Sequence, residues 1–381
     1  MDFAWSDEQL ALRDAIVRFA QSSLNDDVSD RDARSEFSAE GWKRCAEFGI
    51  QGLPAPPEYG GSGADALTTV CALEGLGYGC RDNGLLFSIN AHLWTTVVPL
   101  MTLGTEEQKK RYLAKLASGT WIGAHAMTEP SSGSDAYSLR TQAEKRGDCY
   151  VLNGTKMFVT NAPVADLIVV FATLDPSKGV GGVTGFLVEK GTPGFSVSRK
   201  LDKMGLRTSP MSEVILEDCE VPAENVLAGE GAGATIFTAS MAWERTCILA
   251  SQLGAMQRLL EISVKYAKER QQFGQPIGKF QSVSNKIAEM EVRLEAARLV
   301  LYKAAWEKSQ GKRALQASSM AKLYVSEMCV QNCLDAVQIH GGYGYMTEFQ
   351  IERELRDAIG GTLYSGTSEI QKLIIAGFRG L

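Results

Sequence analysis

The sequence predicts a three-part α+β chain, with an N-terminal helical domain, a central antiparallel β-barrel or sandwich, and a C-terminal four-helix bundle. The chain has 381 residues, two to three times the usual length of one domain. Its hydrophobic pattern is helical, then strand-like, then helical again. With 45% hydrophobic and 22% charged residues, the composition is that of a globular protein. We expect the domains at residues 1–120, 121–232 and 233–381.

The first 120 residues alternate helical patterns with breaks. Ser6 precedes an apolar periodic run and has Gln9 three residues later, which is the arrangement of a capping box. Residues 54–63 contain three prolines and three glycines and predict a long irregular segment. Thr105 begins another short helix that should end before Gly119.

Short apolar runs replace the helical period between residues 121 and 232. Residues 150–152 and 156–160 flank Asn153-Gly154, so we expect a hairpin around that dipeptide. Further strands are expected at the segments 167–172, 185–188, 195–197 and 214–216. Their spacing is typical of a small antiparallel barrel or sandwich.

From residue 233 onward the pattern is that of long helices. One helix carries Leu249, Leu253, Met256 and Leu260 on a single face, and others are expected near 281–309, 313–339, 348–358 and 368–378. The glycine-rich run at residues 229–233 superficially suggests a dinucleotide-binding loop. Because no second strand follows it, we interpret this run as a joint between the β domain and the bundle.

Composition narrows the classes of function. The formal charge of −6 gives no electrostatic reason to expect nucleic acid as a partner. No stretch approaches about 20 uninterrupted apolar residues, and the acidic N-terminus is unlike a targeting segment, so we expect a cytoplasmic protein without a membrane span. The eight cysteines form no C-x-x-C pair, and the sequence predicts no metal site.

Two polar segments carry possible chemistry. Residues 127–135 (Met-Thr-Glu-Pro-Ser-Ser-Gly-Ser-Asp) form a turn that can present backbone N–H and hydroxyl groups to the edge of a flat heteroaromatic ring. Phe158 and Thr160 could add a wall and a further hydroxyl. At the end of a long helix, Arg270 and Phe273 offer a guanidinium for pyrophosphate and a ring for stacking.

Taken together, these segments resemble the acyl-CoA dehydrogenase superfamily of flavoproteins over essentially the whole chain. The matching stretches are residues 127–135, 153–161, 201–207, 269–274, 335–344 and 364–375. The resemblance implies the family's fold, with a helical domain, a central β-barrel and a C-terminal four-helix bundle, and it implies an FAD cofactor. It places Met127, Thr128 and Ser134 around the flavin ring, with Phe158 and Thr160 beside it.

The same resemblance implies a homotetramer in which a neighbouring subunit completes the cofactor site. That contribution would come from Arg270, Phe273, Gln338, Gly341 and Gly342. Thr367 and Glu369 would lie near the cofactor on the C-terminal loop.

The family reaction removes a proton α to a thioester carbonyl while hydride goes to the flavin, so it needs a carboxylate base. Many members place a Glu directly before Gly-Thr-Ser near the C-terminus, but here that position is Ser365. A neutral hydroxyl cannot be this base. A minority of the superfamily carries the base on the first bundle helix, and Glu244 matches that arrangement.

The combination of Glu244 on the helix with Ser365 on the C-terminal loop most resembles the arrangement in one group of enzymes. These are the dehydrogenases and oxidases that act on L-proline bound to a peptidyl carrier protein in natural-product assembly. The implied substrate is a prolyl thioester on a phosphopantetheine arm, and the implied product is a pyrroline or pyrrole. The residues expected to contact the substrate are Met241, Trp243, Arg245, Tyr364 and Ser365. A candidate basic patch for the carrier protein consists of Arg199, Lys200, Lys203 and Arg207.

Three alternatives remain open at this point. The electron acceptor is either an electron-transfer flavoprotein or oxygen. The substrate could instead be a short or branched acyl-CoA, oxidised with Glu244 as base. In a third reading, the chain is a flavoprotein that kept the fold but lost catalysis.

Overall fold

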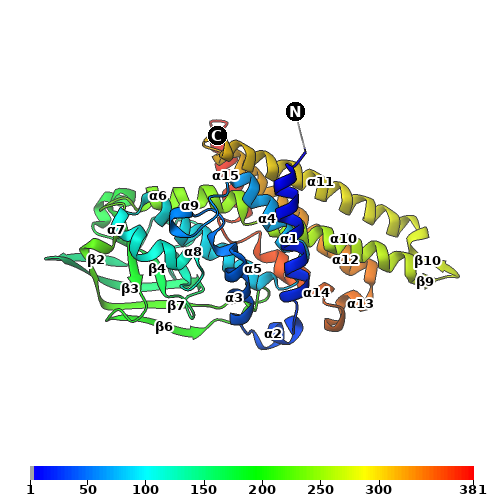
Figure 1. The fold of residues 1–381 in the computed structure, drawn as a ribbon, viewed down its shortest axis with the longest axis horizontal. Coiled ribbons are helices and arrows are strands. Elements are labelled where there is room, and N and C mark those ends of the chain that lie inside the picture. Colours follow the sequence, from blue (N-terminus) through cyan, green and yellow to red (C-terminus); the bar gives the residue numbers. More distant parts are fainter. Residues whose placement is uncertain (1–3) are drawn as a thin grey trace.

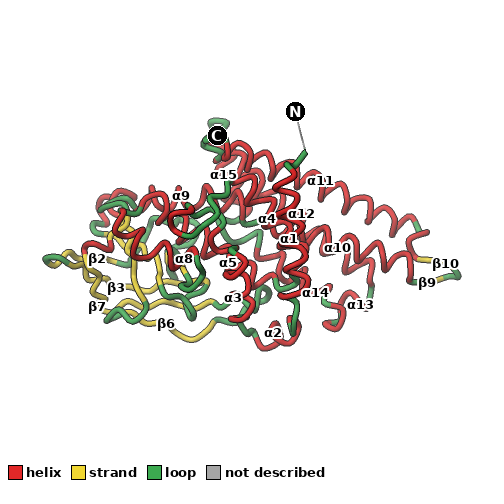
Figure 2. Tube along the Cα trace, in the orientation of Figure 1, coloured by secondary structure: helices red, strands yellow, loops and turns green. Residues whose placement is uncertain are grey.

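A computed structural model describes residues 4–381, and it contains the three expected parts (Figure 1). Residues 1–3 of the acidic N-terminal stretch lie outside the described residues. The strands gather at one end of an elongated molecule, and the long helices run to the other end (Figure 2). The N-terminal helices pack between these two ends.

The N-terminal part contains one long helix and several shorter ones. Ser6 caps the first of them, and both hydrogen bonds of the capping box with Gln9 are present, as the sequence predicts. Thr105 and Gln108 form a second capping box. The helices are α1 (Asp7–Ser23), α2 (Val28–Arg34), α3 (Ala39–Phe48), α4 (Ala66–Gly79), α5 (Asn83–His92), α6 (Val98–Leu103), α7 (Glu106–Gln108) and α8 (Ala114–Ala117).

The central part is one eight-stranded mixed sheet with the order β6-β7-β3-β2-β4-β5-β8, to which β1 is added beside β4. The expected antiparallel barrel is therefore corrected, because β1 and β2 both pair parallel with β4 and the sheet stays open. The strands are β1 (Gly123–Ala126), β2 (Gln142–Arg146), β3 (Cys149–Thr160), β4 (Leu167–Thr173), β5 (Val183–Glu189), β6 (Phe195–Lys200), β7 (Met211–Pro222) and β8 (Val226–Leu227).

The expected hairpin around Asn153-Gly154 is wrong. Strand β3 runs through both residues, and its register against β7 shifts between Leu152 and Gly154. A Cβ at Gly154 would lie 2.5 Å from the Thr141 hydroxyl, so this glycine permits a close approach of two segments rather than a turn. The actual reversal is the Gly147-Asp148 turn between β2 and β3.

The C-terminal part is a bundle of α9, α10, α11 and α12, extended by shorter helices. The expected helix at 281–309 is α11, and the remaining long patterns also agree within a few residues. The elements are α9 (Gly233–Cys247), α10 (Ala250–Glu269), the hairpin β9 (Gln271–Gln272) and β10 (Gln275–Pro276), α11 (Gln281–Ser309), α12 (Leu315–His340), α13 (Gly342–Tyr345), α14 (Ile351–Gly360) and α15 (Ser368–Gly377).

The first and third parts share one apolar core. Buried residues of α1, α4 and α5 pack in the same cluster as those of α10, α11 and α12. Because the glycine-rich run at 229–233 leads into α9 and then α10 rather than into a parallel strand, it is not a dinucleotide-binding loop. One run of the described chain, Asn83–Leu103, is long and apolar enough to cross a membrane, but 89% of its most apolar window is buried inside the fold.

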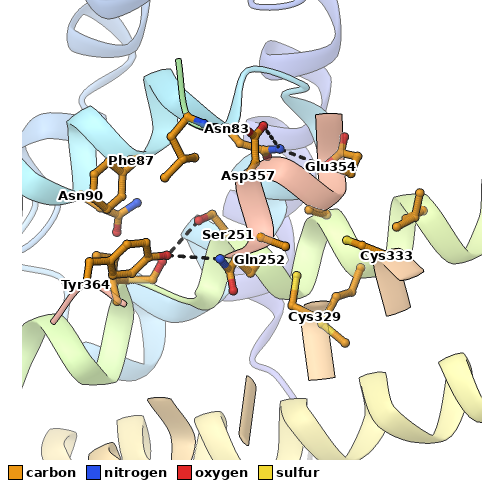
Figure 3. A pocket seen from close by; sticks show the side chains of 16 residues that line it. Asn83, Phe87, Asn90, Ser251, Gln252, Cys329, Cys333, Glu354, Asp357 and Tyr364 are labelled. Carbon is orange, nitrogen blue, oxygen red and sulfur yellow. Dashed lines mark hydrogen bonds between the residues drawn. The ribbon is translucent and has the colours of Figure 1, made fainter. Parts of the chain in front are cut away.

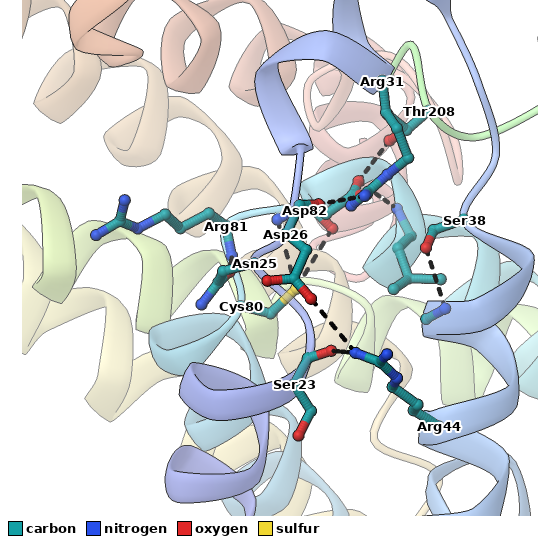
Figure 4. Close-up of polar contacts among 12 residues, drawn as sticks. Ser23, Asn25, Asp26, Arg31, Ser38, Arg44, Cys80, Arg81, Asp82 and Thr208 are labelled. Carbon is teal, nitrogen blue, oxygen red and sulfur yellow. Dashed lines mark hydrogen bonds and ion pairs between the residues drawn. The ribbon is translucent and has the colours of Figure 1, made fainter.

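A buried carboxylate joins the loop before β7 to the N-terminal helices (Figure 4). Asp82 accepts hydrogen bonds from the Thr208 hydroxyl at 2.5 Å and from the Leu85 N–H at 3.0 Å. Arg31 pairs with its other oxygen at 3.2 Å. These contacts fix the β part against α5, and α5 contributes to the cavity described next.

Candidate active site

A cavity of about 340 Å³ lies where the β part meets the helices. One wall comes from β1, the loop after it and β3, and includes Met127, Thr128 and Ser134. A second wall comes from α5, α9 and the loop before α15, and includes Glu244 and Ser365. The volume is in the range of small-molecule sites.

A buried ion pair holds the loop of the β wall in place. The Glu129 carboxylate accepts from Lys156 Nζ at 2.7 Å and from the backbone N–H groups of Arg140 and Thr141 at 2.7 and 3.0 Å. Lys156 also donates to the Met127 carbonyl at 3.2 Å. Burial lowers the pKa of Lys156 to about 8, although Glu129 opposes that change. The pair therefore fixes both ends of the loop that begins at Met127.

Several polar groups of that loop are available to a ligand. Within the described chain, the hydroxyls of Thr128 and Ser134 make no hydrogen bond, and a Cβ at Gly133 would meet nothing within 4 Å. Phe158 lies in an irregular stretch of β3 with a φ of +57°; the residue is 59% exposed and lines the cavity. Thr160 lines the same wall. These residues offer hydroxyl groups and an aromatic face, which fits a flavin ring.

His125 also lines this wall, although no sequence motif singles it out. Its ring stacks on Phe237 and meets Phe171 edge-on, with centroid distances of 6.0 and 5.0 Å. Burial lowers its pKa to about 3, so the imidazole is neutral, and its Nε2 has no partner among the described residues. Only the alternation of β1 could have indicated that this side chain faces the cavity.

Glu244 occupies the helical wall as expected. It lies on α9 and is buried, with 7% of the residue exposed. The Ser365 hydroxyl donates to its Oε1 at 2.5 Å, whereas its Oε2 has no partner among the described residues. Burial raises the pKa of the Glu244 carboxyl, and Ser365, Arg245 and Lys322 counteract that increase in part. A desolvated carboxylate with one uncommitted oxygen can accept a proton.

The loop that carries Ser365 is held from three sides. Arg245 Nε donates to the Ser365 carbonyl at 3.0 Å, Lys322 Nζ donates to the Gly366 carbonyl at 2.7 Å, and Gln371 Nε2 donates to both. Ser365 and Gly366 have left-handed φ values of +59° and +88°. Glycine adopts this conformation readily, but serine is strained there.

The expected substrate residues divide into two groups. Met241, Arg245, Tyr364 and Ser365 all line the cavity. Trp243 does not, because it points to the other side of α9, where it stacks on Trp94 at 5.9 Å and lies beneath Lys308. The expectation that Trp243 contacts the substrate is therefore corrected, because one residue along a helix turns the side chain by about 100°.

The residues expected to complete a neighbour's cofactor site lie elsewhere, at the far end of the bundle. Arg270, Gly341 and Gly342 line a separate, open cavity of about 500 Å³ there. Phe273 lies in the β9–β10 hairpin and is 93% exposed, and Gln338 is also exposed. Neither set reaches the Glu244 cavity within this chain.

The two C-terminal loop residues and the basic patch are placed as follows. Thr367 caps α15 through its side chain, and Glu369 is exposed in the first turn. Of the expected basic patch, Lys203 bonds to the Ser209 carbonyl and Arg207 to the Ser35 hydroxyl. Because these two cations hold the 201–209 segment, only Arg199 and Lys200 remain as exposed charges of that patch.

Comparisons with known proteins identify the family of the chain. The acyl-CoA dehydrogenase N-terminal, middle and C-terminal domains match residues 6–120, 124–219 and 231–378. An L-prolyl-[peptidyl-carrier protein] dehydrogenase of Serratia sp. is 44% identical, covering 100% of this chain and 99% of that protein.

Two solved structures have the same fold at full length. The prolyl acyl carrier protein oxidase AnaB is 54% identical, with a TM-score of 0.98, over 99% of this chain and 100% of AnaB. The structure of PigA with FAD and proline is 43% identical, with a TM-score of 0.98, over 100% of both chains. The chain belongs to the acyl-CoA dehydrogenase family.

Proposed function

We propose that this protein is an FAD-dependent oxidoreductase that oxidises L-proline held as a thioester on a peptidyl carrier protein, giving a pyrroline or pyrrole thioester. One observation carries the proposal: the buried Glu244 carboxylate lines the same cavity as the loop of Thr128 and Ser134. The prolyl-carrier dehydrogenase and oxidase relatives support the choice of substrate.

Glu244 would remove the α-proton of the thioester. An α-proton is weakly acidic, so its base must be near, aligned and poorly solvated. Glu244 meets the last condition through burial and keeps Oε2 free of protein partners in the described chain. The backbone N–H groups of Ser365 and Gly366 also make no hydrogen bond within residues 4–381, so they would support the thioester oxygen as charge develops there.

The residues of the β wall fit FAD. Met127, Thr128, Ser134, Phe158 and Thr160 would surround its ring system, because they combine free hydroxyls with one exposed aromatic face. When bound, FAD supplies the two-electron acceptor for the hydride that leaves the substrate. The neutral His125 forms part of the same wall and adds no positive charge there.

The inner end of the cavity is closed, which favours a compact acyl group. Phe87 and Tyr364 meet with ring centroids 4.7 Å apart, and together with Ile248 they separate this cavity from a second one of about 30 Å³ behind it. Figure 3 shows this inner cavity, where the Tyr364 hydroxyl accepts a hydrogen bond from Gln252 at 3.2 Å. A five-membered ring needs no tunnel beyond this partition.

The proposal extends to partners and location. We propose a homotetramer in which Arg270, Phe273, Gln338, Gly341 and Gly342 complete the FAD site of a neighbouring subunit, with Thr367 and Glu369 near the cofactor. The carrier protein is the macromolecular partner, and an electron-transfer flavoprotein or oxygen takes the electrons. We propose a cytoplasmic location, and domain boundaries after residues 120 and 232.

Mass spectrometry of prolyl-carrier protein after incubation with the purified holoenzyme tests this function. The expected result is a loss of two or four hydrogens from the loaded arm, while a panel of short and branched acyl-CoAs is turned over poorly. Oxidation of the CoA esters with an unchanged prolyl-carrier mass would contradict the proposed substrate. No oxidation of either kind by FAD-loaded protein would contradict enzymatic activity.

A further inference from the structure

The residue that occupies the vacated base position contacts the carboxylate that replaces it. Ser365 lies 121 residues after Glu244, yet its hydroxyl donates to Glu244 Oε1 at 2.5 Å. The contact lies partly buried in the wall of the main cavity, where Glu244 itself is buried. Among the described residues, the Glu244 side chain makes no other hydrogen bond, because its Oε2 has no partner.

The structure maintains this contact at a conformational cost. Ser365 has a φ of +59°, which is unfavourable for a residue with a Cβ. Arg245, Lys322 and Gln371 hold its carbonyl and that of Gly366 from α9, α12 and α15. Three donors from three helices thus aim the hydroxyl at the carboxylate. A loop with no task at this point would be more stable with glycine at 365.

From this geometry we infer that Ser365 is a positioning residue for the base: its hydroxyl holds Glu244 Oε1 and leaves Oε2 as the oxygen that accepts the substrate proton. This inference rests on the proposed function of Glu244. The hydroxyl removes rotational freedom from the carboxylate and favours its ionised form, because a donor to a charged oxygen stabilises that charge.

Other charged groups near Glu244 also influence its ionisation, so their contribution must be distinguished from that of the Ser365 hydroxyl. The titratable and charged groups that face it are Arg245 on its own helix, Lys322 on α12 and Tyr364 on the loop before α15. Burial lowers the pKa of Lys322 to about 8 and also lowers that of Arg245. Both cations remain in place when only the Ser365 hydroxyl is removed, so a substitution at 365 reports on the hydroxyl itself.

The experiment compares Ser365→Ala and Ser365→Gly. Both remove the hydroxyl, but only glycine relieves the left-handed backbone. Infrared difference spectroscopy follows the Glu244 carboxyl band as pH is varied, with the band assigned by its loss in Glu244→Gln. Ser240→Ala is the matched control, because that serine is buried one turn earlier on α9 and donates to the Trp94 carbonyl instead.

We expect the Glu244 titration midpoint to rise by about one pH unit in both variants. The acid limb of kcat/KM should move by the same amount, while Ser240→Ala keeps the wild-type midpoint. An unchanged midpoint in both variants would overturn the inference. A shift in alanine that glycine restores would also overturn it, since the backbone would then be the cause.

The outcome for Glu244→Gln distinguishes the two proposals. If that variant oxidises prolyl-carrier protein at the wild-type rate, the proposed function of Glu244 fails, whatever Ser365 does. If Glu244→Gln is inactive and the Ser365 variants titrate like wild type, only the positioning inference fails.

Discussion

At the scale of single residues, the site depends on an exchange between two positions. The loop position that holds the base in many family members carries Ser365, and the helix position Glu244 carries the carboxylate. The Ser365 hydroxyl and the Glu244 carboxylate lie 2.5 Å apart. The carboxylate therefore lies next to the usual loop position, although it is carried by α9. Sequence reasoning could locate both residues, because each belongs to a local motif, but not their contact.

The raised pKa of Glu244 predicts the pH dependence of activity. Glu244 accepts a proton only when ionised, and burial raises its pKa above the ordinary value. We therefore expect kcat/KM to fall as pH decreases through this raised pKa, that is, at a pH above the usual glutamate value of about 4.3. A kcat/KM profile measured with a saturating electron acceptor checks this, and an acid limb at or below that value would disagree.

The same shift predicts a cost in stability. A carboxyl whose pKa is raised in the folded state contributes stability below its unfolded pKa and loses it as pH rises through the folded value. Glu244→Gln abolishes this titration. Thermal unfolding should therefore show that the variant gains stability relative to wild type as pH rises from 4 toward 8. A constant difference across that range would show that Glu244 titrates normally.

At the scale of elements, local signals predicted helices better than strand pairing. The 281–309 helix, the Ser6 capping box and the helix start at Thr105 follow from short-range patterns, and the structure contains all three. The pairing of β1 and β2 with β4 depends on residues far apart in sequence, so the parallel register could not be predicted. The Asn153-Gly154 dipeptide incorrectly predicted a turn, because Gly154 is needed where Thr141 packs too close for a Cβ.

The loop of the β wall should depend on the buried Lys156–Glu129 pair. Both side chains are almost fully buried, at 0% and 2% exposure, so Lys156→Met leaves an unpaired buried carboxylate. We expect the free energy of unfolding to fall by about 3–5 kcal/mol, together with a loss of FAD affinity. Chemical denaturation and flavin titration measure both effects.

Lys145→Met is the matched control for that experiment. Lys145 pairs with Glu230 at 2.9 Å, but both side chains are about half exposed. Surface pairs contribute little, so this variant should unfold and bind FAD like wild type. An equal loss in both variants would contradict a special role for the buried pair.

The partition behind the cavity should determine how long an acyl group can be. Phe87→Ala removes one of the two rings that separate the main cavity from the inner one. We expect turnover of prolyl-carrier protein to fall and turnover of longer straight acyl thioesters to rise. Relative kcat/KM values across a chain-length series measure this. Phe48→Ala, which removes a ring stacked on Phe19 away from the cavity, should leave the preference unchanged. An unaltered chain-length preference in Phe87→Ala would contradict this role of the partition.

At the scale of the whole molecule, the expected site residues form two separate groups. Glu244 and the β wall line one cavity, whereas Arg270, Gly341 and Gly342 line another at the far end of the bundle. Sequence order alone could not show this separation, because it results from the length and direction of α10 and α12. The exposed Phe273 ring projects from that same end. The proposed homotetramer, in which a second copy completes the site, would explain both groups.

Subunit complementation tests that arrangement. Arg270→Ala and Glu244→Gln chains damage opposite halves of a shared site, so each should be inactive when expressed alone. Random mixed tetramers should recover about a quarter of the wild-type activity, because one site in four receives both intact halves. Co-expression with two affinity tags measures the recovery. Its absence, with mixed tetramers confirmed by mass, would contradict a shared site.

The proposed chemistry depends on Glu244 as the base for oxidation of the prolyl thioester. The most direct measurement mixes FAD-loaded protein with prolyl-carrier protein in the absence of oxygen and follows loss of the flavin absorbance in a single turnover. If Glu244 is the base, we expect rapid bleaching in wild type and bleaching slower by about 10²–10⁴-fold in Glu244→Gln, with FAD still bound. Bleaching of the variant at the wild-type rate would contradict this role of Glu244.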